Sequence, residues 1–124
     1  MDNNIYRDLI LDHYKNPRNF GHLEHASCTA EEYNSACGDR IVMEVELENR
    51  KSKIAIRNIK FNGEGCAISQ AAASMLTEKV KGMTKEEVMN ITPEHIMEML
   101  GTTLTPSRVK CALLPLEVLQ KSIG

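Results

Sequence analysis

The feature that most constrains the fold is an alternation of apolar and acidic side chains within residues 41–48. The apolar set is Ile41, Met43, Val45 and Leu47, and the acidic set is Glu44, Glu46 and Glu48. A period of two residues is that of a β-strand with one buried face. A polar turn follows, and apolar side chains return in residues 53–61 with a shift of parity that predicts a bulge near Arg57 and Asn58. We therefore expect a β-hairpin.

On both sides of this hairpin, apolar side chains recur at the spacing of a helix. Residues 5–14 repeat apolar side chains at the spacing of a helix, which Pro17 ends because the residue before a proline is disfavoured in the α region. Residues 26–35 form a weaker candidate strand. Residues 66–81 carry an apolar stripe at helical spacing, and Gly82 ends that helix.

The C-terminal part of the sequence predicts further helices. Thr84 opens a short helix with a candidate capping box, and Thr92, followed by a proline, opens another that reaches about Leu100. Residues 109–123 predict the last helix, in which Pro115 should cause a kink or a late start. Strands first and helices after them predict an α+β domain, a small three-stranded antiparallel sheet packed by about four to five helices.

The composition fits a single folded domain over residues 1–124. With 124 residues and 42% hydrophobic side chains, the chain can bury a core of its own. Its net charge of −2 argues against a general nucleic-acid footprint. The longest apolar run, residues 111–114, is far shorter than the about 20 residues of a membrane span, and no signal-peptide core is present. We expect a cytoplasmic protein, a monomer or weak homo-oligomer that binds neither nucleic acid nor membrane.

The cysteines point to a site, because a cytoplasmic chain keeps its thiols reduced. The absence of any C-x-x-C pair excludes a zinc finger. Cys37 precedes the clearest strand, and Cys66 and Cys111 lie at the predicted starts of helices, where exposed N–H groups lower the pKa of a thiol. Asp39 follows Cys37 closely and can share one side of extended chain with it. Spacing alone leaves two alternatives open, a metal or sulfur site and a set of unrelated buried thiols.

A metal site built from these residues needs positive charge around it. Three thiolates and a carboxylate outweigh the charge of a zinc ion or of an oxidised two-iron, two-sulfide core, and buried net charge has to be compensated. Arg40, Arg108 and Lys110 lie within a few positions of the candidate ligands. They are either the compensating charges or part of a solvated basic face.

Five ordered segments carry a resemblance to a known family. The first two read Y-R-D-L-I-L-D-H-Y-K-N-P-R-N at 6–19 and A-C-G-D-R at 36–40. The others read F-N-G-E-G-C-A-I-S-Q-A-A-A-S at 61–74, T-E-K-V-K-G at 77–82 and S-R-V-K-C-A-L-L at 107–114. From Tyr6 to about Leu119 the chain resembles the U-type iron–sulfur cluster assembly scaffolds, the family of IscU, SufU and the NifU N-terminal domain. That family has a small antiparallel sheet packed by helices.

The resemblance implies that Cys37, Asp39, Cys66 and Cys111 hold a transient [2Fe–2S] cluster or, alternatively, a zinc ion. It implies a cysteine desulfurase as partner, which passes persulfide sulfur to Cys111 or Cys37, and iron–sulfur acceptor or carrier proteins as recipients. A protein of this kind is a scaffold and carrier, not a turnover enzyme. Asp39 is a harder and weaker cluster ligand than a thiolate, so we expect it to serve iron entry and cluster release.

Three features leave the branch of the family open. Lys110 stands where IscU-type members carry histidine and resembles the SufU-type branch, whose members act as zinc-dependent sulfur acceptors. SufU-type chains, however, carry an insertion before the last site cysteine that this chain lacks. Residues 104–110 lack the L-P-P-V-K chaperone-recognition segment of IscU-type members. The alternative function is therefore a zinc-bound sulfurtransferase partner of a cysteine desulfurase, and a third is a zinc-stabilised interaction module.

The remaining cysteine and the histidines are not assigned to the site. Cys28 matches no ligand of the family and is interpreted as a structural thiol. The four histidines have no paired spacing with the cysteines, and we expect them at the surface. They are His13, His22, His25 and His95.

Overall fold

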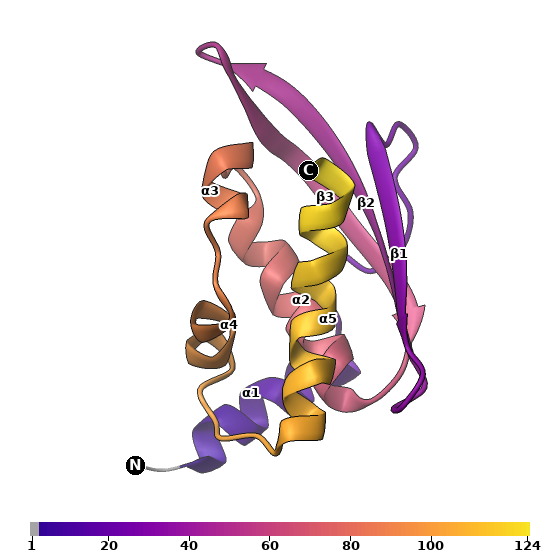
Figure 1. Cartoon of the computed structure of the whole chain (residues 1–124), viewed down its shortest axis with the longest axis vertical. Helices are drawn as coiled ribbons and strands as arrows, with labels where there is room; N and C mark the ends of the chain where they lie inside the picture. Colours follow the sequence, from indigo (N-terminus) through magenta and orange to yellow (C-terminus); the bar gives the residue numbers. More distant parts are fainter. Residues whose placement is uncertain (1–2) are drawn as a thin grey trace.

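Five helices and three strands form within residues 3–124, the part of the chain that the computed structural model describes (Figure 1). They are α1 (Asn3–Lys15), β1 (Cys28–Asn34), β2 (Asp39–Arg50), β3 (Lys53–Glu64), α2 (Ala67–Val80), α3 (Lys85–Met89), α4 (Pro93–Leu100) and α5 (Pro106–Ile123). The strands make an antiparallel sheet of order β1-β2-β3, which confirms the predicted α+β class. Among the described helices, none is long and apolar enough to cross a membrane.

The predicted hairpin is β2 paired with β3. Glu46 faces Asn58 and Leu47 faces Ile56, so Arg57 is an extra residue on β3. This is the bulge that the shift of parity predicts. Because the bulge changes the alternation, Ile56 and Ile59 are both fully buried although they have opposite parity.

The first half of β2 is buried on both faces, whereas the alternation predicted one buried face. Val42 and Glu44, on the face expected to be polar and solvated, are buried as well. The connection from α1 to β1 lies against Glu44. The Glu44 carboxylate accepts a hydrogen bond from the Leu23 N–H at 2.8 Å and lies 2.7 Å from His22 Nδ1. The glutamate tolerates burial because its oxygens are bonded.

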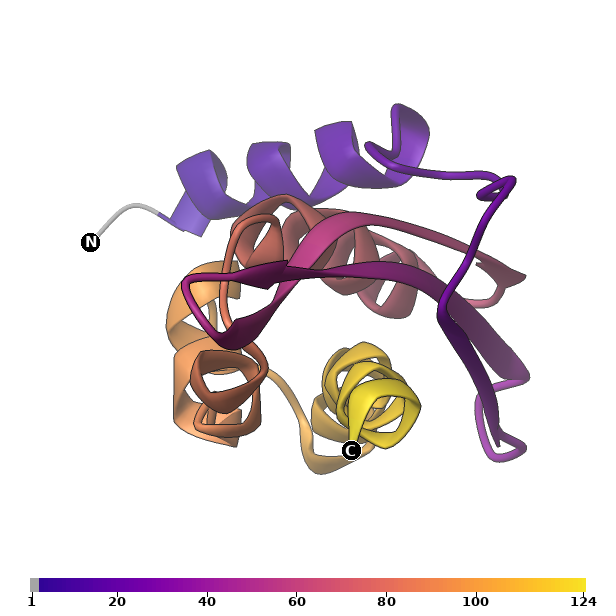
Figure 2. The same cartoon turned by 90° about the horizontal axis from the view of Figure 1, so that it is seen from above.

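Helices α2 and α5 pack against the sheet and close the apolar core. Figure 2 shows the sheet curving around α5, with α1 lying over α2 at the top of the view. Phe61 on β3 and Leu119 on α5 are fully buried between these layers. Helix α5 begins at Pro106, where a proline has no hydrogen bond to lose, and continues through Pro115. The expectation of a late start at Pro115 is therefore wrong.

The two short helices begin with the predicted side-chain caps. Thr84 Oγ1 accepts from the Glu87 N–H at 3.2 Å, and the Glu87 carboxylate accepts from the Thr84 N–H at 2.8 Å. Thr92 and His95 repeat this arrangement, with the imidazole Nδ1 as the second acceptor, 3.0 Å from the Thr92 N–H. Each cap satisfies backbone donors that the first turn leaves free.

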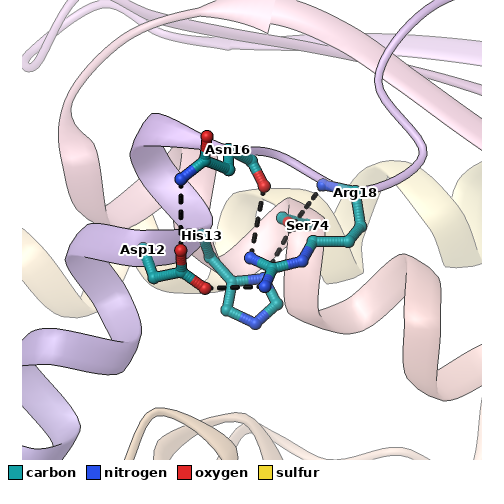
Figure 3. Close-up of polar contacts among 5 residues, drawn as sticks. All are labelled: Asp12, His13, Asn16, Arg18 and Ser74. Atoms are coloured by element: carbon teal, nitrogen blue, oxygen red, sulfur yellow. Dashed lines mark hydrogen bonds and ion pairs between the residues drawn. The ribbon is translucent and has the colours of Figure 1, made fainter.

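His13 is buried, so the expectation that all four histidines lie at the surface is wrong for this residue. It is 6% exposed, and its Nδ1 lies 2.7 Å from the Ser74 hydroxyl on α2. The same hydroxyl accepts from the Arg18 N–H at 2.8 Å, and the Arg18 guanidinium pairs with Asp12 at 2.6 Å (Figure 3). This network fastens the C-terminal end of α1 to α2. The other three histidines are exposed, as expected.

Acidification is expected to destabilise the protein through His13. Burial, and then the positive charge of Arg18, lowers the pKa of His13 below its ordinary value of 6.5. The folded state therefore binds a proton at this histidine only at a lower pH than the unfolded state does. The stability that comes from burying a neutral His13 is fully present above pH 6.5. The free energy of unfolding decreases as the pH falls below 6.5. Urea unfolding above and below pH 6.5 measures the loss, which should shrink in His13→Asn and persist in the control His25→Asn. An unchanged pH dependence in His13→Asn contradicts the prediction.

Candidate metal centre

Two donor side chains that are close in sequence meet a third, remote one at one end of the molecule. Cys37 lies in the loop between β1 and β2, Asp39 is the first residue of β2, and Cys111 lies on α5. Their two Sγ atoms and a carboxylate oxygen lie within 4.8 Å of one another. In Figure 1, this loop, the start of α2 and the first turns of α5 converge at the lower end of the molecule. Two sulfurs and one oxygen at this separation form a group that can hold a metal ion.

Cys66 adjoins these three donors from the N-terminus of α2, although it is not one of the group within 4.8 Å. It occupies the N-cap position, where the sequence placed it, and its backbone N–H donates to Asp39 Oδ1 at 2.8 Å. The second carboxylate oxygen, Oδ2, is buried and has no hydrogen-bond partner within residues 3–124. A buried oxygen without a partner costs free energy, so the donor set fits a cation at this position.

Gly65 allows Asp39 and the start of α2 to come this close. Its φ is +150°, and a Cβ at this residue would lie 2.2 Å from Asp39 Oδ1 and 2.9 Å from Asp39 Cα. Only glycine avoids that collision. The atoms approached are those of the candidate carboxylate ligand.

The protein environment of Cys111 favours a neutral thiol. Burial raises the pKa of this thiol above its ordinary value of 9.0, and the neighbouring side chains of Cys37, Asp39 and Cys66 raise it further. The expectation that a helix start lowers the pKa is wrong for Cys111. Helix α5 begins at Pro106 and places Cys111 in its second turn, past the exposed N–H groups. A bound cation would supply the positive charge that converts this thiol to thiolate.

Of the two alternatives left open for Arg40, its contacts favour a charge on the surface over a compensating charge for the centre. Its guanidinium lies 2.6 Å from a Glu31 oxygen and 3.4 Å from a Glu64 oxygen. Successive side chains of a strand point to opposite faces, so Arg40 points away from the face that carries Asp39. Its charge is therefore used in ion pairs on neighbouring strands.

Arg108 and Lys110 remain candidates for that role. Both are exposed, and neither makes an ion pair in the described part of the chain. Lys110 lines a hollow of about 270 Å³ between the end of β1 and α5, whereas Arg108 lines one of about 560 Å³ between α1 and the start of α5. The two cations thus stand on different sides of Cys111.

Asn34 is the residue of this centre that sequence reasoning missed. Its side-chain Nδ2 donates to Cys111 Sγ at 3.8 Å, and its backbone carbonyl oxygen accepts from the Cys37 N–H at 3.2 Å. An asparagine in a turn is common, so no sequence signal marks it. Cys28 begins β1 at the opposite end from Asn34 and packs against the core, which agrees with a structural thiol.

A comparison with protein families decides what kind of domain this is. The family described as the NifU-like N terminal domain matches residues 5–124. The chain belongs to this family. The match includes all four candidate ligands and confirms the resemblance found in the five sequence segments.

Curated relatives of this NifU-like chain fall into both branches. The zinc-dependent sulfurtransferase SufU of Bacillus subtilis is 34% identical, with 97% of this chain and 90% of that protein aligned over 137 positions. The iron–sulfur cluster assembly scaffold protein IscU of Aquifex aeolicus is 37% identical, with 95% and 73% aligned over 118 positions. The longer alignment contains positions that this 124-residue chain lacks, as expected for a missing insertion.

Solved structures share the fold. A protein from Fervidobacterium islandicum, assigned as an iron–sulfur cluster assembly scaffold for the SUF system, gives a TM-score of 0.81 at 28% identity, with 100% of both chains covered. The N-terminal domain of a NifU-like protein from Brucella abortus gives a TM-score of 0.73 at 19% identity, with 98% of this chain and 93% of that chain covered. These likenesses confirm the predicted sheet packed by helices.

Proposed function

We propose that this chain is a scaffold on which [2Fe–2S] clusters are assembled and from which they are transferred. Cys37, Asp39, Cys66 and Cys111 hold the cluster, which is cargo and not a resident cofactor. The observation that carries the proposal is the buried Asp39 Oδ2, which has no hydrogen-bond partner in the described residues and belongs to the same donor group as two thiols. A hard oxygen ligand among soft sulfur ligands suits iron that has to be bound and released.

Sulfur arrives as the persulfide of a cysteine desulfurase. A thiolate of the scaffold, from Cys37 or Cys111, attacks the outer sulfur atom. A new S–S bond forms on the scaffold while the S–S bond of the desulfurase breaks and its thiolate leaves, without net oxidation. Conversion of this sulfur to sulfide needs electrons, which ferrous iron supplies in part and an external reductant completes. Cys37 is half-buried and Cys111 is buried, so Cys37 is the more accessible acceptor.

Lys110 is proposed as the charge partner of the loaded centre. The thiolates and the carboxylate leave the centre with net negative charge even when iron is bound. An exposed ammonium group next to Cys111 in the sequence offsets that charge in part. The cluster then passes to iron–sulfur acceptor or carrier proteins.

The alternative is a zinc-bound sulfurtransferase that passes sulfur onward without building a cluster. Two observations favour it, Lys110 beside the last site cysteine and the 34% identity with a protein named as a zinc-dependent sulfurtransferase. The shorter chain and the 37% identity with a protein named as an assembly scaffold favour the first function. Whether the chain turns over as an enzyme follows from which of the two holds.

Anaerobic reconstitution with ferrous iron, cysteine, a cysteine desulfurase and a reductant tests the proposal. We expect a coloured two-iron species, measured by visible absorption and metal analysis, in the wild type and in the matched control Cys28→Ser. Cys37→Ser should lose it. A colourless protein with one tight zinc ion that still accepts sulfur as a persulfide would instead establish the sulfurtransferase.

Asp39→Ala is expected to keep a loaded cluster several times longer than the wild type. The carboxylate is the weakest ligand of the set and the place where the cluster is opened, so its removal slows release. The decay of visible absorbance in the presence of an iron chelator measures the lifetime, with Asp12→Ala as a control at an exposed carboxylate. A faster loss in Asp39→Ala contradicts the proposed role in release.

A further inference from the structure

Asn34 adjoins three of the four candidate ligands, through two hydrogen bonds and one cross-strand pairing. Its side-chain Nδ2 donates to Cys111 Sγ at 3.8 Å, and its backbone carbonyl oxygen accepts from the Cys37 N–H at 3.2 Å. It is also the cross-strand partner of Asp39 in the pairing of β1 with β2. One half-buried residue thus links the loop of Cys37, the strand of Asp39 and the helix of Cys111.

Two hydrogen bonds hold the Cys111 sulfur, and metal loading affects them differently. The thiol of Cys111 donates to the Ser107 carbonyl oxygen at 3.5 Å, and this bond needs the thiol proton. The Asn34 amide donates to the same sulfur, and this bond strengthens when the sulfur is anionic. A metal ion displaces the proton, so the bond from Asn34 is the one that persists.

We propose that Asn34 is a positioning residue that orients the Cys111 sulfur toward the metal and stays bonded to it after loading. This inference rests on the proposed function in taking Cys111 as a ligand. It goes beyond it in naming the group outside the ligand set that holds that sulfur in place. Such outer groups fix the orientation of ligands, and hydrogen bonds to the sulfurs of a cluster change its reduction potential.

Zinc affinity, measured by competition with a chromophoric chelator, tests the role of Asn34 in the whole chain. Asn34→Leu keeps the size of the side chain and removes the donor, and it should weaken zinc binding about 10–100-fold. Asn34→Gln keeps an amide donor and should recover a large part of the affinity. Asn49→Leu changes an exposed asparagine near the far end of β2 and should bind zinc like the wild type.

A spectroscopic signature separates positioning from folding. In a proton–nitrogen NMR spectrum, the side-chain amide signal of Asn34 should move when zinc is added to the wild type and move less in Cys111→Ser. Wild-type zinc affinity in Asn34→Leu, equal losses in Asn34→Leu and Asn34→Gln, or an amide signal that zinc does not move would overturn the proposal.

Failure of this proposal is distinct from failure of the proposed function. Cys37→Ser, measured in the same zinc competition, should lose affinity whether or not Asn34 acts as proposed. If Cys37→Ser binds zinc like the wild type, the metal centre itself is refuted. If Cys37→Ser loses zinc affinity but Asn34→Leu binds zinc like the wild type, the metal centre stands and the proposed role of Asn34 is refuted.

Discussion

Gly65→Ala is expected to lower the free energy of unfolding by about 2–3 kcal/mol and to abolish tight metal binding. At φ +150°, alanine is strained, and its Cβ would lie 2.2 Å from Asp39 Oδ1 and 2.9 Å from Asp39 Cα. The second atom belongs to the backbone of β2, so rotation of the Asp39 side chain does not relieve the collision. Either the start of β2 or the connection into α2 has to move, and the hydrogen bond from the Cys66 N–H to Asp39 is lost.

Gly38→Ala is the matched control for this prediction. Gly38 also has a positive φ, +69°, and lies beside Asp39, but apart from its two chain neighbours no atom of the described residues lies within 4 Å of the Cβ that alanine would add. Its cost is therefore the backbone strain alone, about 1–2 kcal/mol, and the donor atoms stay in place. Urea unfolding and zinc titration of the two variants measure the difference. Equal zinc affinities would show that the close approach at Gly65 does not shape the centre.

The sheet could be predicted because its signals are local. The period of two in residues 41–48 requires only neighbours in the sequence, and the shift of parity in residues 53–61 located the bulge at Arg57. The caps at Thr84 and Thr92 are equally local, since each hydrogen bond spans three residues. Features that depend on side chains within one turn or one strand pair were thus accessible from sequence.

The burial of polar side chains was not accessible in this way. Glu44 is buried because Leu23 and His22, about twenty positions earlier, bring donors to its carboxylate. His13 is buried because Ser74, 61 positions later, offers a hydroxyl. A glutamate in a strand and a histidine in a helix carry no sign of such partners, so the sequence assigned both to the surface.

The candidate site was predicted only in part. The positions of Cys37, Cys66 and Cys111 near the ends of elements, together with the family resemblance, named the candidate ligands, and the fold brings Cys37, Asp39 and Cys111 together. The surrounding residues were not predicted. Asn34 reaches Cys111 across 77 positions, and Arg40 is directed to Glu31 by the face of the strand it occupies. Both depend on how β1 pairs with β2 and packs against α5.

Zinc is expected to raise the melting temperature by about 10 °C when it is present at 100 times its dissociation constant. Binding to the folded state alone at that concentration adds about 2.7 kcal/mol of stability, and each kcal/mol shifts the midpoint of a chain of this size by several degrees. This gain in stability requires that the folded centre bind zinc. The buried Asp39 Oδ2, which has no hydrogen-bond partner in the described residues, indicates that it can accept a cation. Thermal unfolding with and without zinc measures it, with Cys28→Ser as the variant that keeps the shift and Cys111→Ser as the variant that loses most of it.

The rise in melting temperature that zinc causes is expected to become smaller as the pH falls. The pKa of the Cys111 thiol is raised by burial and by the neighbouring side chains of Cys37, Asp39 and Cys66, so this thiol holds its proton at neutral pH. Zinc must displace that proton, and each proton released lowers the apparent affinity about tenfold for every pH unit of acidification below the pKa. Calorimetric titrations in buffers of different ionisation enthalpy count the protons. Binding that releases no proton would mean that the ion bypasses the thiols of the centre, and it would contradict the prediction.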